Sequence, residues 1–232
     1  MAKRGRPPKV DHLRVSLIRD ITSARNLVNS VKASSGINPK SSIPRIHVKH
    51  AQRVIELAFM GVVAAWEDFL EQVLVRYLAG AKTDSGYQPS LRIGATSGIA
   101  HSYEVLMGDP KFNPSKNYIG FSAPVDVIDA AKLFLDHGQP FQNALNPKVD
   151  MLKNAIKIRN RSAHSSDKCI TDFVNTAKQI LNVNKLKQSY RPANLLDAPA
   201  QRGFGQSVQQ RNITYFEAFM EMFEDLANKI VP

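Results

Sequence analysis

The strongest constraint on the fold is a long apolar seam between residues 47 and 79. Its members recur in steps of three and four, as on one face of an α-helix, and Gly80 ends the pattern. The seam consists of Val48, Ala51, Ile55, Ala58, Val62, Ala65 and Phe69. A helix of this length packs along most of a partner element, as in a helical bundle or a dimer. The sequence therefore predicts a bundle built around a helix at about 47–79.

Shorter apolar stripes with the same spacing predict further helices. They lie near residues 13–31, 97–107, 124–135, 149–163, 168–183 and 211–230. Residues 80–123 are otherwise rich in Gly, Pro, Ser and Asn, and 184–206 form a polar connection. No alternating pattern is long enough to predict a sheet, so the expected class is all-α. We expect a basic, disordered tail over 1–10 and one helical domain over 11–232, with its motif region at 147–183.

Composition excludes several classes of protein. The chain has 232 residues and is 43% hydrophobic, which suits a packed core. Its apolar runs are too short for a membrane span, and its first residues lack the pattern of a secretory signal. Cys169 is the single cysteine, and no Cys/His spacing matches a metal site, so neither metal nor cofactor is expected. These features indicate a cytoplasmic protein without membrane contact.

The positive charge is concentrated at the N-terminus. Residues 1–49 contain 11 Lys and Arg against two acids, whereas residues 50–232 contain 20 Lys and Arg against 18 acids. A cationic arm on a nearly neutral body is typical of proteins that bind nucleic acid, because neutralising phosphates releases condensed counterions. A tail that only improves solubility is the alternative.

The first nine residues resemble an AT-hook, whose Arg-Gly-Arg-Pro core lies in the minor groove of A·T-rich DNA. Gly lets the backbone approach the groove floor, Pro keeps the chain extended, and Arg side chains meet the negative potential of the narrow groove. The residues expected to contact nucleic acid here are Lys3, Arg4, Gly5, Arg6, Pro7 and Lys9.

An arginine interrupts the apolar stripe of the predicted helix that begins near residue 149. Steps of three and four lead along Val149, Leu152, Ile156, Arg159 and Ala163. The pattern predicts that Arg159 points inward, where a guanidinium needs a carboxylate, a subunit boundary or a phosphate. His164 lies about 140° further round an ideal helix. The two side chains therefore converge only if the helix ends or bends near 165–166, or if a second subunit brings its copies close.

Arg159, Asn160 and His164 together resemble the R-x(4–6)-H signature of the HEPN superfamily, in which a polar residue often follows the Arg. The segment 65–71 is also similar to an early helix of HEPN proteins from prokaryotic defence and toxin loci. Two other Arg-to-His matches, Arg6 to His12 and Arg45 to His50, lack the Asn. The resemblance covers about residues 11–183. It implies a homodimeric helical bundle and a metal-independent endoribonuclease that leaves a 2′,3′-cyclic phosphate, in a defence or toxin–antitoxin system with a neutralising or assembly partner.

The resemblance implies a role for each residue of the motif. His164 acts as base or acid, Arg159 holds the phosphate, and Asn160 orients the phosphate or the histidine. Lys157 and Arg161 are expected to contact the RNA backbone. The alternative is a non-catalytic, HEPN-like module that binds DNA through its basic arm or assembles with a partner, with Arg159 and His164 forming a structural or ligand-binding pair.

Overall fold

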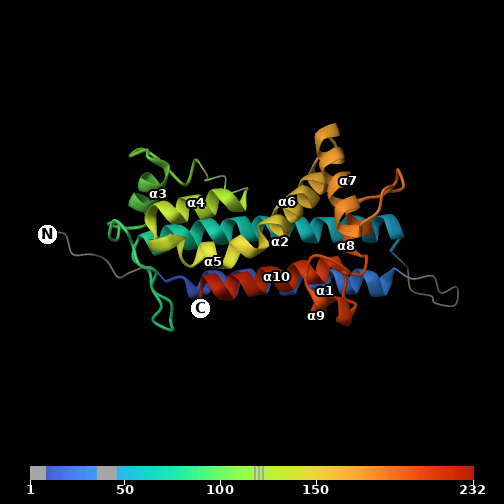
Figure 1. Ribbon diagram of the computed structural model, residues 1–232, viewed down its shortest axis with the longest axis horizontal. Coiled ribbons are helices and arrows are strands. Elements are labelled where there is room, and N and C mark those ends of the chain that lie inside the picture. The colour runs from blue at the N-terminus through green and yellow to red at the C-terminus, as the bar shows by residue number, and fades with distance from the viewer. Residues whose placement is uncertain (1–8, 36–45, 118, 120, 122) are drawn as a thin grey trace. The chain divides into compact units, whose positions relative to one another are not determined.

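The computed structural model describes residues 9–35, 46–117, 119, 121 and 123–232. Its elements are helices, and the described residues pair as β-structure only in isolated bridges, which confirms the all-α class. Figure 1 shows the helices in chain order. The α-helices are α1 (Asp11–Ser34), α2 (Val48–Leu78), α3 (Ile99–Met107), α4 (Pro124–Phe134), α5 (Phe141–Leu145), α6 (Val149–Ala163), α7 (Asp167–Leu181), α8 (Pro192–Leu196), α9 (Gln206–Arg211) and α10 (Tyr215–Ile230). Short 3₁₀ turns lie at Asp136–Gly138 and Asn146–Lys148.

Helix α2 confirms the long helix that the apolar seam predicted. It has 31 residues, and most of the seam is buried. The buried members are Ala51, Ile55, Ala58, Val62 and Phe69. Trp66 beside them is also buried and stacks on Phe69, with ring centroids 5.6 Å apart. None of the described helices, α2 included, is both long and apolar enough to cross a membrane.

The chain packs as two compact units, each with its own core. Unit 1 is built from Met1–Ile18, Ala65–Leu152 and Glu224–Pro232. Tyr77 lies at its centre: the ring meets Phe141 edge-on at 6.3 Å, and the hydroxyl donates a 2.8 Å hydrogen bond to the Ile230 carbonyl oxygen. Burial raises the pKa of Tyr77, so this hydroxyl keeps its proton at neutral pH.

Unit 2 is built from Arg19–Ala64 and Lys153–Phe223. Its core contains an aromatic cluster around Phe219, whose ring packs edge-on against Phe59 at 5.3 Å and against Phe204 at 5.0 Å. Ion pairs add to the packing at the surface of this unit, including Arg25 to Glu217 at 2.7 Å. The motif region from Lys153 onward belongs to this unit, so the core of unit 2 positions the candidate site.

Two five-residue helices escaped the sequence prediction. Helix α5 comes directly before the turn at 146–148, and α8 lies inside the stretch 184–206, which was expected to be a connection only. Helix α9 escaped as well, because it lies between the expected connection and the expected last helix at about 211–230. All three helices are too short to show helical periodicity. Helix α8 is nevertheless anchored in unit 2, because Ala193, Leu195 and Leu196 are buried.

Candidate functional site

The predicted motif lies at the end of α6 and in the turn that follows. The last helical residue is Ala163, and the His164 N–H still donates to the Asn160 carbonyl oxygen at 2.8 Å. Ser166 then caps α7, with its hydroxyl oxygen accepting the Cys169 N–H at 3.4 Å. A helix end followed at once by a new N-cap exposes backbone carbonyl oxygens that need donors. The motif therefore occupies a helix end, where cationic side chains can donate to the free carbonyl oxygens.

The buried stripe of α6 differs from the predicted one. The stripe comprises Leu152, Ala155, Ile158 and Ser162. Isoleucine occurs at both 156 and 158, and the fully buried one is Ile158. The buried face of the helix is therefore rotated away from the predicted stripe through Val149, Ile156 and Ala163. Arg159 consequently flanks the buried stripe and is half-buried, and Ala163 is exposed. The structure thus places Arg159 at the edge of the inner face, with its Nε atom buried, and the buried stripe runs through Ile158 in place of Ile156.

The three signature residues differ in their access to solvent. His164 is exposed, Asn160 is half-buried, and the Nε atom of Arg159 is buried. Arg161 contacts the backbone of the histidine, because its Nη1 donates to the His164 carbonyl oxygen at 3.1 Å. The His164 side chain is therefore accessible to a phosphate group from solvent, and the Arg161 guanidinium lies beside the backbone of the same residue.

Arg53 also contacts the end of α6, and the sequence reasoning missed it. Its Nη1 donates to the Ser162 carbonyl oxygen at 2.9 Å and to Glu56 Oε2 at 3.1 Å. Glu56 is only 5% exposed, and its other oxygen accepts the Ala193 N–H at 3.4 Å. The one local signal is the spacing of Arg53 and Glu56, which places them on the same face of a helix. The contact with Ser162 spans more than 100 residues of sequence and has no local signature.

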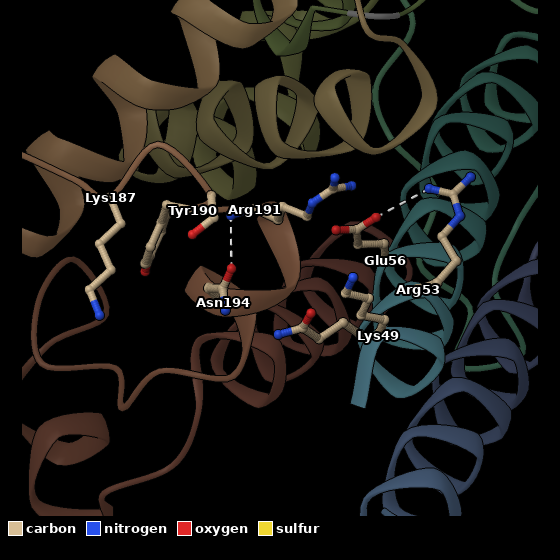
Figure 2. Close-up of a pocket in the computed structure, with 9 residues that line it drawn as sticks. Lys49, Arg53, Glu56, Lys187, Tyr190, Arg191 and Asn194 are labelled. Atoms are coloured by element: carbon tan, nitrogen blue, oxygen red, sulfur yellow. Dashed lines mark hydrogen bonds and ion pairs between the residues drawn. The ribbon is translucent and has the colours of Figure 1, made fainter. Parts of the chain in front are cut away.

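Arg53 and Glu56 line a basic cavity of ≈ 580 Å³ in unit 2 (Figure 2). Four of its residues are cationic, namely Lys49, Arg53, Lys187 and Arg191. Figure 2 shows Lys187 and Arg191 on either side of Tyr190. The Arg191 N–H donates to Asn194 Oδ1 at 2.8 Å, which holds this loop against the start of α8. The lining thus combines an excess of positive charge with one buried carboxylate.

A second basic cavity, of ≈ 490 Å³, is lined by α6, α7 and the loop after α7. Its four cations are Arg161, Lys178, Lys185 and Lys187. Tyr190 lines this cavity as well and stacks on Phe173, with ring centroids 6.4 Å apart and planes at 17°. Burial raises the pKa of Tyr190, so its hydroxyl is neutral and able to donate. A stacked aromatic ring among cations is a typical nucleic-acid-binding arrangement.

The other residues predicted to bind nucleic acid are distributed differently. Lys3, Arg4, Gly5, Arg6 and Pro7 lie outside the described residues. Lys9 is described: it is exposed and pairs with Asp84 at 3.3 Å.

Lys157 and Arg161 come from the same helix but have different surroundings. Lys157 is half-buried on α6 and lines neither cavity, whereas Arg161 lines the second one. Among the described residues, no cluster of three or more His, Cys, Asp or Glu side chains could hold a metal ion.

Comparisons with protein-family models, with curated proteins and with solved structures give no match for this chain. The resemblance to the HEPN superfamily therefore rests on Arg159, Asn160 and His164, together with the segment 65–71 of α2. The two basic cavities and the contacts of Arg53 and Arg161 are independent of that resemblance.

Proposed function

We propose that this protein is a metal-independent endoribonuclease that cleaves RNA at the end of α6. One observation carries the proposal: the exposed His164 follows a helix end that two arginines contact, and each arginine lines a basic cavity. Together the two cavities present seven cationic side chains and a single acidic one, Glu56. Such a surface favours a polyanion, and histidine is a residue type that can act as an acid or a base in catalysis.

The chemistry needs two proton transfers. The ribose 2′-oxygen forms a bond to phosphorus, and the bond from phosphorus to the 5′-oxygen breaks, which leaves a 2′,3′-cyclic phosphate. A base takes the 2′-hydroxyl proton and an acid delivers a proton to the departing 5′-oxygen. His164 supplies one of these steps, and the second copy of the chain in a homodimer supplies the other.

Charge stabilisation comes from groups near the histidine. The guanidinium of Arg161 offers a planar set of donors that matches phosphate oxygens. Asn160, one turn before His164, orients either the phosphate or the imidazole. Arg159 has a buried Nε and flanks the core of the unit, so its guanidinium reaches phosphate only through its outer nitrogen atoms.

The burial of the Arg159 Nε atom favours a second candidate function, a non-catalytic nucleic-acid-binding or partner-assembly module. In that case Arg159 stabilises the end of α6, and the basic cavities bind without turnover. The N-terminal arm then contributes DNA binding. Salt-sensitive DNA binding that disappears when residues 1–9 are deleted, with no RNA cleavage, supports this candidate.

The biological setting belongs to the same proposal. A metal-independent ribonuclease harms its own cell unless it is restrained, which suits a cytoplasmic protein of a prokaryotic defence or toxin–antitoxin system. A partner that covers the basic cavities or separates the two copies neutralises such an enzyme. Co-purification of a tightly bound protein from the native host tests this part.

The decisive experiment incubates the purified protein with end-labelled RNA in EDTA. We expect cleavage by the wild type and a loss of about 100-fold or more in His164→Ala, the usual range for removing an acid–base group. His12→Ala is the matched control, because His12 is also exposed and also lies a few residues after an arginine, Arg6, but without the Asn of the signature. Equal cleavage by wild type and His164→Ala, or products that end in a 3′-hydroxyl, contradicts the proposal.

A further inference from the structure

The loop after α7, from residue 185 to residue 191, connects the two basic cavities. Lys187 and Tyr190 line both of them. We propose that this loop is the centre of a track for a single RNA strand, which runs from the cavity beside Arg53 to the cavity beside Arg161. The inference rests on the proposed function for the identity of the strand as RNA, and it adds the path and the residues that hold it.

The distribution of charge supports a track rather than an isolated anion site. The cations are spread over four different elements: the start of α2, the end of α6, helix α7 and the loop after α7. A single phosphate needs two or three donors at one point, whereas these cations follow a surface that passes through both cavities. Repeated phosphates of one strand match such a spread, because each neutralises a cation and releases counterions.

Tyr190 adds a stacking surface in the middle of the track. Its ring rests nearly parallel on the buried Phe173, which holds it in one orientation before any ligand arrives. Bases stack on aromatic rings with little dependence on sequence, because every base has a π-face. Base faces are accessible in a single strand and hidden in a duplex, which favours an unpaired strand here.

Glu56 and Arg53 fix the first end of the track. Arg53 Nη1 is held by Glu56 Oε2 and by the Ser162 carbonyl oxygen, while its side chain remains 52% exposed. Arg161 is held in the same manner by the His164 carbonyl oxygen. Both guanidiniums are thus pre-oriented at the end of α6, with further N–H groups available to phosphate. A strand in the track therefore passes the residue proposed to cleave it.

The first test compares two double variants that remove the same charge. Lys185→Ala/Lys187→Ala lies in the track, and Lys111→Ala/Lys116→Ala removes two exposed lysines of unit 1. The probe is a fluorescein-labelled RNA with 2′-O-methylated riboses, which cannot be cleaved through its 2′-oxygen, and the readout is anisotropy over a salt series. We expect the track variant to bind more weakly and to reduce the slope of log K against log salt by about 1.4. Equal losses in both variants overturn the track.

The second test addresses the stacking ring. We expect Tyr190→Leu to weaken binding of the same RNA about ten-fold, within the range measured for one stacked base, and Tyr190→Phe to bind like the wild type. Circular dichroism melting checks that both variants stay folded. Wild-type affinity in a folded Tyr190→Leu overturns the stacking role, and so does an equal loss in Tyr190→Phe.

Competition experiments separate the track from other occupants. A duplex of the same sequence should compete poorly, and so should a mononucleotide. Full competition by a mononucleotide would show a nucleotide pocket instead, and preference for the deoxyribose strand would show DNA as the occupant; either result overturns the inference. Binding that follows these expectations without any cleavage of ordinary RNA removes the nuclease proposal and leaves the track intact.

Discussion

Two glutamates of the same helix, Glu56 and Glu71 of α2, have opposite surroundings. Glu56 contacts the Arg53 guanidinium and the Ala193 N–H, and it faces a cavity lined by four cations. Glu71 lies in unit 1 and accepts a 2.8 Å hydrogen bond from the neutral hydroxyl of Tyr103. Burial raises the pKa of Glu71 above 4.5, and repulsion from Asp68 adds to the effect.

The surroundings of Glu56 suit the binding of an anion, whereas those of Glu71 serve the packing of unit 1. In unit 2 a carboxylate orients an arginine beside open, cationic space. In unit 1 the carboxyl of Glu71 is a hydrogen-bond acceptor for Tyr103, whose ring is only 3% exposed and stacks on Phe112 at 5.8 Å. Both side chains are partly or wholly buried glutamates, so burial alone does not identify a functional acid. The two sites are distinguished by the charge of the groups around each carboxyl, which is cationic at Glu56 and neutral at the Tyr103 hydroxyl beside Glu71.

The largest expected effect comes from removing the carboxylate of Glu56. Glu56→Ala removes the carboxylate that pairs with the Arg53 guanidinium and leaves the Ala193 N–H without its acceptor. We expect a loss of about 2 kcal/mol in the free energy of unfolding, measured in urea, most of it from the buried Ala193 N–H, because the Arg53 side chain is 52% exposed and stays solvated. Asp68→Ala on the same helix is the control, because Asp68 is exposed, and it should change stability by less than about 0.5 kcal/mol. Equal costs in the two variants would contradict the role assigned to Glu56.

Tyr103→Phe should have a smaller effect. It removes the hydroxyl that donates to Glu71 and accepts from Gln72 Nε2 at 2.9 Å. We expect a cost of about 1–2 kcal/mol in the free energy of unfolding. The hydrogen bond from Tyr103 lowers the pKa of Glu71, so its loss should raise that pKa further. NMR titration of the labelled carboxyl measures the change; an unaltered pKa would mean that the hydrogen bond is unimportant.

Glu71→Gln should have the smallest effect and a distinctive pH dependence. The folded protein binds the Glu71 proton more tightly than the unfolded chain, so wild-type stability falls as pH rises from 4.5 through the raised pKa of the folded state. Glutamine does not ionise and still accepts from Tyr103. We expect Glu71→Gln to be equal to or up to about 1 kcal/mol more stable than the wild type at pH 7. The advantage should vanish below pH 4.5, and an advantage that grows toward acid would contradict this account.

Much of the helical layout was predictable, and the reasons are local. The stripe of α2 repeats over many turns, and Gly80 follows its end, so both its existence and its length could be inferred. Pro124 starts α4 as predicted. The inner face of α6 was harder to predict, because the isoleucines at 156 and 158 allow two stripes, and only the tertiary structure shows that Ile158 is the buried one.

The candidate site was predictable only in part. The exposed His164 at a helix end follows from the Ser165-Ser166 signal for a new N-cap. The cavities do not follow from the sequence, since each joins residues that are far apart along the chain, such as Arg53 with Arg191 and Arg161 with Lys185. No spacing rule links such residues.

The sequence by itself determined the longer helices, among them α2, α6 and α7, and the place near Ser166 where one helix gives way to the next. Hydrophobic periodicity and the residues that start or stop a helix depend on neighbours within a few helical turns, so they can be interpreted without the rest of the fold. Only the tertiary structure decided which face of α6 is buried, that Arg53 reaches the end of that helix, and that Tyr190 stacks on Phe173 between two basic cavities. Such contacts depend on long-range packing, because the burial of apolar surface selects among arrangements that are locally equivalent.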